Sequence, residues 1–294
     1  MAVLCQIGGF LVKRFLVFPT LICLSAVLIS GCASTEETNS ESEQTESTKS
    51  ASSEQEQTKE NAEGENAEPQ EAEEKQTEKQ EEQQEPQYKV SEVSSIVPID
   101  DANSQVALLT FDDAPDKYAL EIAESLKEAD APAIFFVNGH FLTTDEEKET
   151  LKKIHDMGFA IGNHTYSHAN LNDLIDEEAK EEIIKVNEQV EEVIGEKPEF
   201  FRAPFGENTD YSRQLAEDEG MTVMNWTYGY DWESQYQNSD ALADIMVNTE
   251  LLGNGANLLM HDREWTAAAV PDIVTGLRDK GYELVDPETI ERPS

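Results

Sequence analysis

A regular alternation of short apolar runs with amphipathic segments, over the last two thirds of the 294-residue chain, most constrains the fold. The apolar runs are rich in β-branched and aromatic residues, whereas the segments between them carry apolar residues at helical spacing. Several of these helical segments are followed by glycine, the residue expected after the C-terminus of a helix. Repeated strand–helix units predict a parallel sheet, either a barrel or an open doubly wound sheet.

The pattern predicts seven strands and six helices within one domain. The expected strands are 106–111, 133–137, 159–162, 200–203, 222–226, 257–260 and 282–285. The expected helices are 117–129, 146–157, 176–194, 210–218, 239–251 and 266–280. No Gly-x-Gly-x-x-Gly follows the first expected strand, so nothing supports a dinucleotide-binding fold.

Polar motifs follow several of the apolar runs. They read Thr-Phe-Asp-Asp at 110–113, His-Thr-Tyr-Ser-His at 164–168, Arg-Ala-Pro-Phe at 202–205, Asp-Trp at 231–232 and Leu-Met-His-Asp at 259–262. Because α/β barrels place their chemistry at the C-terminal ends of the strands, we expect these motifs to converge. Together they supply the groups that a metal-assisted hydrolase needs.

Asp112 and Asp113 are adjacent carboxylates, so one can bind a metal while the other takes a proton from water. His164 and His168 are four residues apart, and on a helical turn that spacing places both imidazoles on one face. With Asp113 they would form a two-histidine, one-carboxylate site with open positions for water and substrate. The alternative for each motif alone is a turn aspartate or a surface histidine.

Two further residues carry suitable charge. Arg202 can pair with a carboxylate and lower its pKa. His261 ends an apolar run, and its reference pKa of about 6.5 suits a group that protonates a leaving amine. Taken alone, Arg202 would be a surface arginine on a proline-containing loop, and His261 a satisfied core or loop histidine.

The order and spacing of these motifs resemble the polysaccharide deacetylase family, carbohydrate esterase family 4, over roughly residues 105–290. The resemblance implies an α/β fold, an irregular (β/α)7 barrel that forms a single catalytic domain. It implies that Asp112 is the catalytic base. It also implies that Asp113, His164 and His168 bind the metal, which the donor types suit to zinc and also to cobalt, iron or manganese.

The resemblance assigns roles to the remaining motifs as well. Arg202 braces the base, and Phe205 helps to bind the oxyanion through its backbone N–H. His261 is the general acid, Trp232 walls the substrate groove, and Leu259 lines the pocket for the acetyl methyl group.

One motif departs from the family pattern. Family members usually carry an additional aspartate a few residues before Asp231, where this chain has Tyr228, Gly229 and Tyr230. Asp231 is the remaining candidate to orient His261, and from the sequence this role stays open.

The first 31 residues are predicted to be a lipoprotein signal peptide. Lys13 and Arg14 precede an apolar run, 15–29, which is short for a transmembrane helix. Ser30 and Gly31 before Cys32 resemble a lipobox, which implies a lipidated Cys32. The alternative is an uncleaved N-terminal anchor, and both interpretations place the domain outside the cytoplasm, attached to the membrane.

Residues 32–98 are predicted to be a disordered linker that carries Cys32, and residues 99–294 the catalytic domain. Positions 33–98 hold 19 Glu and 5 Lys, and a segment of this composition cannot bury enough apolar surface to fold.

Of the net charge of −41, the two basic residues before the linker contribute +2 and positions 33–98 contribute 5 − 19 = −14, which leaves −29 on the domain. Such a charge argues against nucleic acid as a partner. The domain contains no cysteine, which excludes a disulfide framework there, and we expect a monomer.

The function expected from the resemblance is metal-dependent N-deacetylation of amino-sugar residues in an extracellular or cell-envelope polysaccharide, peptidoglycan or a related glycan. Two alternatives remain open at this point. One is an O-acetyl esterase acting on a xylan-like polysaccharide, and the other is a non-catalytic, glycan-binding lipoprotein on the same fold.

Overall fold

The computed structural model describes residues 85–293, and all structural statements concern that part of the chain. The predicted signal peptide, Cys32 and most of the predicted linker lie outside the described residues. Within residues 85–293, no helix is both long and apolar enough to span a membrane.

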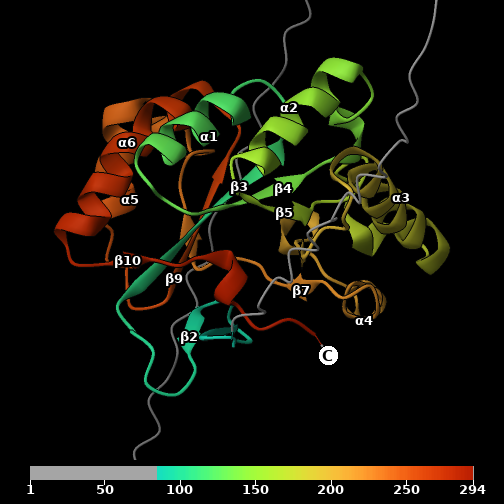
Figure 1. Cartoon of the computed structure of the whole chain (residues 1–294), viewed down its shortest axis with the longest axis horizontal. Helices are drawn as coiled ribbons and strands as arrows, with labels where there is room; N and C mark the ends of the chain where they lie inside the picture. Colours follow the sequence, from blue (N-terminus) through green and yellow to red (C-terminus); the bar gives the residue numbers. More distant parts are fainter. Residues whose placement is uncertain (1–84, 294) are drawn as a thin grey trace, which may run out of the picture. The chain divides into compact units, whose positions relative to one another are not determined.

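A curled parallel sheet with helices packed around it forms the domain (Figure 1). Its strands are β3 (Val106–Ala114), β4 (Ile134–Val137), β5 (Ala160–Asn163), β6 (Phe200–Phe201), β7 (Thr222–Val223), β8 (Tyr228–Gly229), β9 (Ala256–His261) and β10 (Glu283–Leu284). The strand order is β7-β6-β5-β4-β3-β9-β8, and β10 pairs with the beginning of β3. The predicted α/β barrel architecture is confirmed, with one difference in how the two edges of the sheet are connected.

The two edges of the sheet are joined by one chain segment, residues 222–229. β7 at its start pairs with β6, and β8 at its end pairs with β9. Between them, the Met224 N–H donates to the Phe201 carbonyl, and the Thr227 N–H donates to the Asn257 carbonyl. Of the expected strand at 222–226, only residues 222–223 form a strand, and a second short strand that was not expected follows at 228–229. The reason is that the backbone changes hydrogen-bonding partner partway along the segment.

The six expected helices are all present, with ends shifted by a few residues at most. They are α1 (Ala119–Glu128), α2 (Asp145–Asp156), α3 (Asp176–Ile194), α4 (Asp210–Asp218), α5 (Ser239–Asn248) and α6 (Glu264–Asp279). Local signals set several ends: α2 begins with a Thr144–Glu147 capping box, and α3 ends at Gly195 with φ of 88°.

An antiparallel pair of short strands, β1 (Tyr88–Val90) and β2 (Ile96–Pro98), precedes the barrel. Tyr88 and Ile96 are buried in one apolar cluster with residues from the barrel strands. The Ile96 N–H also donates to the Gly255 carbonyl at 2.8 Å. The last part of the predicted linker, residues 88–98, therefore packs its apolar side chains against the barrel.

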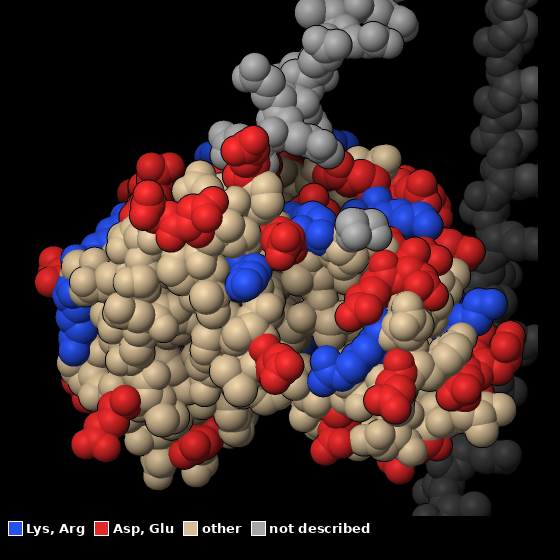
Figure 2. All heavy atoms as spheres, turned by 90° about the horizontal axis from the view of Figure 1, so that it is seen from below, with Lys and Arg blue, Asp and Glu red and all other residues tan. Residues whose placement is uncertain are grey.

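The acidic excess of the domain is spread over its surface. Figure 2 shows one face on which Asp and Glu side chains are scattered widely, with Lys and Arg between them. Interspersed charges of this kind keep a protein solvated, and a surplus of carboxylates repels polyanions.

Candidate metal and catalytic site

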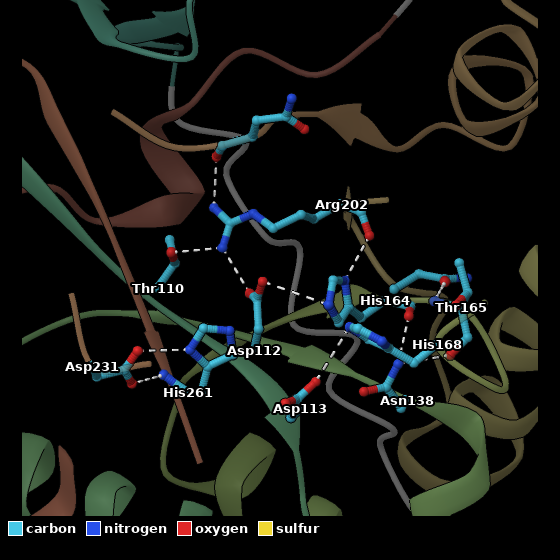
Figure 3. A network of polar contacts seen from close by, with 12 residues as sticks. Thr110, Asp112, Asp113, Asn138, His164, Thr165, His168, Arg202, Asp231 and His261 are labelled. Atoms are coloured by element: carbon cyan, nitrogen blue, oxygen red, sulfur yellow. Dashed lines mark hydrogen bonds and ion pairs between the residues drawn. The ribbon is translucent and has the colours of Figure 1, made fainter. Parts of the chain in front are cut away.

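The five polar motifs come together at the C-terminal ends of the barrel strands (Figure 3). Asp112 and His261 are direct neighbours in the register of β3 and β9. His164 follows β5 and Arg202 follows β6, whereas Asp231 follows β8. The convergence predicted from the strand ends is therefore what the fold produces.

Asp112 lies in β3 and is almost completely buried. Its Oδ1 accepts a hydrogen bond from Arg202 Nη1 at 2.7 Å. Its Oδ2 faces His164 Nε2 at 3.6 Å, as Figure 3 shows. One carboxylate oxygen is thus occupied by the arginine, and the other points toward the histidine pair.

Arg202 is fully buried and has several partners besides Asp112. Nη1 also donates to Thr110 Oγ1 at 2.8 Å, and Nη2 donates to the Asn225 carbonyl at 2.7 Å. The guanidinium lies over the Phe136 ring, 4.2 Å from its centroid. Burial lowers the pKa of Arg202, and the carboxylate of Asp112 opposes that shift. Because an arginine remains charged in proteins, the buried ion pair fixes the orientation of the Asp112 side chain.

Asp113, His164 and His168 form the one group of three within residues 85–293 whose ligand atoms lie close enough for a metal, all within 4.8 Å of one another. His164 Nδ1 hydrogen-bonds the Arg202 carbonyl at 2.7 Å, so that nitrogen carries the proton and Nε2 is free to bind. The histidines lie on a loop and not on the helical turn expected from their spacing. Thr165 and His168 have φ of 66° and 61°, and these left-handed residues bring the two imidazoles together.

The histidine loop is held by contacts with neighbouring elements. The Thr165 N–H donates to Asn163 Oδ1 at 2.8 Å, and the Asn138 side-chain amide donates to the Thr165 carbonyl at 3.2 Å. Ser167 donates from its N–H and its hydroxyl to the two carboxylate oxygens of Glu182 on α3, at 2.7 and 2.8 Å. The Thr165 hydroxyl is buried and has no hydrogen-bond partner in the described residues.

The charged groups around Asp113 favour the carboxylate form that a metal ligand needs. Burial raises the pKa of Asp113, but the nearby His164, His261 and His168 and the Arg263 guanidinium outweigh this and lower it. The pKa of His168 is lowered, chiefly by burial and then by His164. A charged carboxylate together with two imidazole nitrogens is the donor set that zinc and similar divalent ions bind.

His261 lies on the other side of Asp112 and is oriented by Asp231. His261 Nδ1 is 2.8 Å from Asp231 Oδ1, and the His261 N–H donates to Asp231 Oδ2 at 2.6 Å. The Thr266 hydroxyl donates to the same Oδ2 at 2.9 Å. Burial lowers the pKa of His261, but the hydrogen bond and charge of Asp231, with help from Asp112 and Asp113, raise it overall. Asp231 therefore contacts His261 and orients it, a role that the sequence alone left open.

Two exposed aromatic side chains flank the site. Phe205, 61% exposed with φ of 60°, packs edge-on against His168 at 4.9 Å between ring centroids. Trp232, 47% exposed, packs edge-on against His261 at 5.6 Å. Exposed aromatic faces of this size are suited to sugar rings. Leu259 is buried within β9, and its proposed contact with the acetyl methyl group stays a prediction.

Three residues that follow His261 also contact the site, although the motifs in the sequence assigned them no role. Arg263 Nη2 donates to Asp113 Oδ2 at 2.7 Å. Trp265 Nε1 donates to the Asp231 carbonyl at 2.8 Å. The Asp262 carboxylate accepts the backbone N–H groups of Asp116, Lys117, Tyr118 and Ala119. Their position directly after a candidate catalytic histidine was the available signal.

A cavity of about 540 Å³ opens beside the metal ligands. Asp113 and His168 form part of its wall, together with Arg263 and the aromatic side chains of Tyr118 and Trp265. The cavity is therefore continuous with the candidate metal site.

The comparisons with known proteins agree on one family. A model of the family described as polysaccharide deacetylase matches residues 100–224. The peptidoglycan-N-acetylglucosamine deacetylase of Bacillus cereus is 31% identical over 193 residues, which is 62% of this chain and 67% of that protein.

Two further relatives have solved structures. The peptidoglycan-N-acetylmuramic acid deacetylase PdaC of Bacillus subtilis is 33% identical over 194 residues, 65% of this chain and 40% of that protein. Its structure matches with a TM-score of 0.56 and 32% identity, covering 63% of this chain and 89% of that one. Wild-type BA3943 of Bacillus anthracis, a pseudoenzyme of carbohydrate esterase family 4, matches with a TM-score of 0.57 and 29% identity, covering 63% and 64%.

Proposed function

Because the chain belongs to the polysaccharide deacetylase family, we propose that it is a metal-dependent N-deacetylase of a cell-envelope polysaccharide. Its substrate would be an N-acetylated amino-sugar residue of peptidoglycan or of a related glycan, the polymer named for two of the relatives. The observation that carries the proposal is the complete set of groups at the strand ends: a three-donor metal site flanked by a buried Asp112–Arg202 pair and a partly buried Asp231–His261 pair.

Asp113, His164 and His168 would hold the divalent ion, for which their donor atoms suit zinc, with cobalt, iron or manganese as alternatives. When bound, such an ion polarises the acetamide carbonyl and increases the acidity of water.

Asp112 is placed to accept the proton of the attacking water. Arg202 occupies Oδ1, so Oδ2, which faces the histidine pair, is the oxygen available for this proton. The buried arginine holds the carboxylate in one orientation before the proton arrives.

His261 is placed to protonate the leaving amine as the carbon–nitrogen bond breaks. Asp231 binds Nδ1, so Nε2 is the nitrogen that can donate. The raised pKa of His261 favours the imidazolium form that a general acid needs. Asp112 is thereby assigned to remove a proton and His261 to donate one, from different sides of the site.

An O-acetyl esterase would use the same residues, because an alkoxide is an easier leaving group than an amine. The family also includes a protein described as a pseudoenzyme, so a non-catalytic role is the other alternative. Incubating the purified domain with acetylated amino-sugar oligomers and with acetylated xylan separates the three possibilities. We expect free amine from the first substrate, abolished by a chelator; acetate from xylan alone, or no product from either substrate, would contradict the proposal.

We also propose that the protein is a lipid-anchored, extracytoplasmic monomer, with residues 1–31 as signal peptide and Cys32 as the lipidated residue. The support is the sequence pattern around Cys32, a residue outside the described part of the structure. Replacing Cys32 by Ala should release the protein from membranes or stall its processing. An unchanged membrane fraction that retains residues 1–31 would instead support an uncleaved anchor.

A further inference from the structure

The two adjacent carboxylates of the site each contact an arginine of their own. Arg202 binds the base Asp112 from within the barrel, whereas Arg263 binds Asp113 from the wall of the cavity. Within the described residues, Arg263 is the one hydrogen-bond donor to the Asp113 carboxylate. Its side chain is 36% exposed.

The two oxygens of Asp113 have different neighbours. Oδ2 accepts the hydrogen bond from Arg263 Nη2 at 2.7 Å. Oδ1 lies 3.7 Å from His168 Nε2, on the side of the metal donors. The arginine therefore occupies one oxygen of Asp113 and leaves the other, the one beside His168, without a hydrogen bond among the described residues.

Arg263 is itself held in place by the loop that follows β9. Its Nη1 donates to the Asp262 carbonyl at 2.8 Å. The Asp262 side chain is fastened to the start of α1 through four backbone N–H groups. The guanidinium thus links Asp113 to the loop after β9, and Asp262 of that loop is anchored to the backbone at the start of α1.

We propose that Arg263 is a positioning residue for the metal ligand Asp113. It holds Oδ2 so that Asp113 presents Oδ1 alone to the position shared with His164 and His168. Contacts of this kind, one layer behind the ligands, orient them and reduce metal affinity when they are lost. The inference rests on the proposed function only in taking Asp113 as a ligand.

A purely electrostatic role for Arg263 predicts the opposite sign. A cation close to a divalent metal ion repels it, so removing the charge alone would strengthen metal binding. Removing an orienting contact weakens metal binding. The direction of the change therefore distinguishes the two roles.

The test is zinc affinity of the metal-free protein, measured by competition with a chromogenic chelator, for wild type and three variants. Arg263→Gln should bind zinc about 10–100-fold more weakly than wild type. Arg263→Lys keeps the charge but loses the planar fork that binds Asp113 and the Asp262 carbonyl together, so its affinity should also fall. Lys117→Gln is the matched control, because Lys117 is the other cation of the cavity and lies 4.0 Å from Asp116; its zinc affinity should change much less.

Kinetics at saturating zinc add a second measurement. If Arg263 acts through the metal ligand, KM for the glycan in Arg263→Gln should approach the wild-type value once zinc is saturating. Circular dichroism and thermal unfolding establish that each variant is folded before it is compared.

Three outcomes would overturn the positioning role. They are equal or tighter zinc binding by Arg263→Gln, wild-type affinity in Arg263→Lys, or a raised KM at saturating zinc with unchanged zinc affinity, which would make Arg263 a substrate-binding residue. All three leave the proposed function standing. A wild-type protein that binds no zinc or other divalent ion would overturn both proposals together.

Discussion

Asp112 and Asp113 are neighbours of the same residue type, each paired with an arginine at 2.7 Å, yet the fold places them in different surroundings. The Asp112–Arg202 pair is almost fully buried, whereas the Asp113–Arg263 pair is partly open to solvent at the cavity. The comparison shows that the surroundings, and not the residue type, distinguish a candidate base from a candidate metal ligand.

The backbone explains how both carboxylates reach one site. Successive residues of a regular strand point to opposite faces of the sheet. The pairing of β3 with β4 changes register between Phe111 and Ala114, and Asp113 has φ of 63°. Such an irregularity re-aims a side chain, which lets Asp113 join the site beside Asp112.

The largest effect is expected when the two histidines that would bind the metal together with Asp113 are both removed. Replacing His164 and His168 together by Ala leaves Asp113 as a single donor, so the domain should lose both stoichiometric metal and activity. Elemental analysis of the purified variant measures the first, and amine release from the glycan measures the second. Full metal occupancy in the double variant would contradict the ligand assignment.

Replacing one carboxylate at a time should separate the role of catalytic base from the role of metal ligand. Asp112→Asn should keep the metal while its rate falls by about 10²–10⁴-fold, the usual effect of losing a general base. Asp113→Asn is the matched partner and should lose metal as well as activity. If Asp112→Asn loses the metal and Asp113→Asn retains it, the two assignments must be exchanged.

The two arginines should differ in their effect on stability. Arg202→Met leaves the buried Asp112 carboxylate without its partner and should lower the free energy of unfolding by about 3–5 kcal/mol. Arg263→Gln removes a partly exposed pair and should lower it by about 0–1 kcal/mol. Urea denaturation measures both values, and similar losses for the two variants would show that burial does not distinguish the pairs.

The smallest expected effect is a shift in pH dependence caused by Asp231, the buried carboxylate that contacts His261. A general acid must be protonated, so activity should fall as pH rises through the pKa of His261, which Asp231 raises. Asp231→Asn removes that contribution, and the alkaline limb of the kcat/KM profile should move to lower pH. Glu233→Gln removes the same charge two residues away and should leave the limb in place; an unmoved limb in Asp231→Asn would remove the general-acid assignment of His261.

Much of this arrangement could be predicted from residue order alone. Hydrophobic periodicity predicted six helices and a parallel sheet, because periods of about two and 3.6 residues identify strands and helices without tertiary information; the barrel form of that sheet was implied by the family resemblance. Polar motifs at strand ends predicted which residues meet, because parallel strands present their C-terminal ends at one edge. Asp112, Asp113, His164, His168, Arg202 and His261 do converge there.

Only the tertiary structure decided how those side chains are oriented. The loop between His164 and His168, the turned backbone at Asp113 and the contact between Asp231 and His261 depend on dihedral angles and on neighbours far away in the chain. The same holds for Arg263, whose partner Asp113 is 150 residues earlier. Residue types and their periodicity determined which groups the site contains. Contacts between distant segments, which no local pattern encodes, determined which oxygen or nitrogen each group presents.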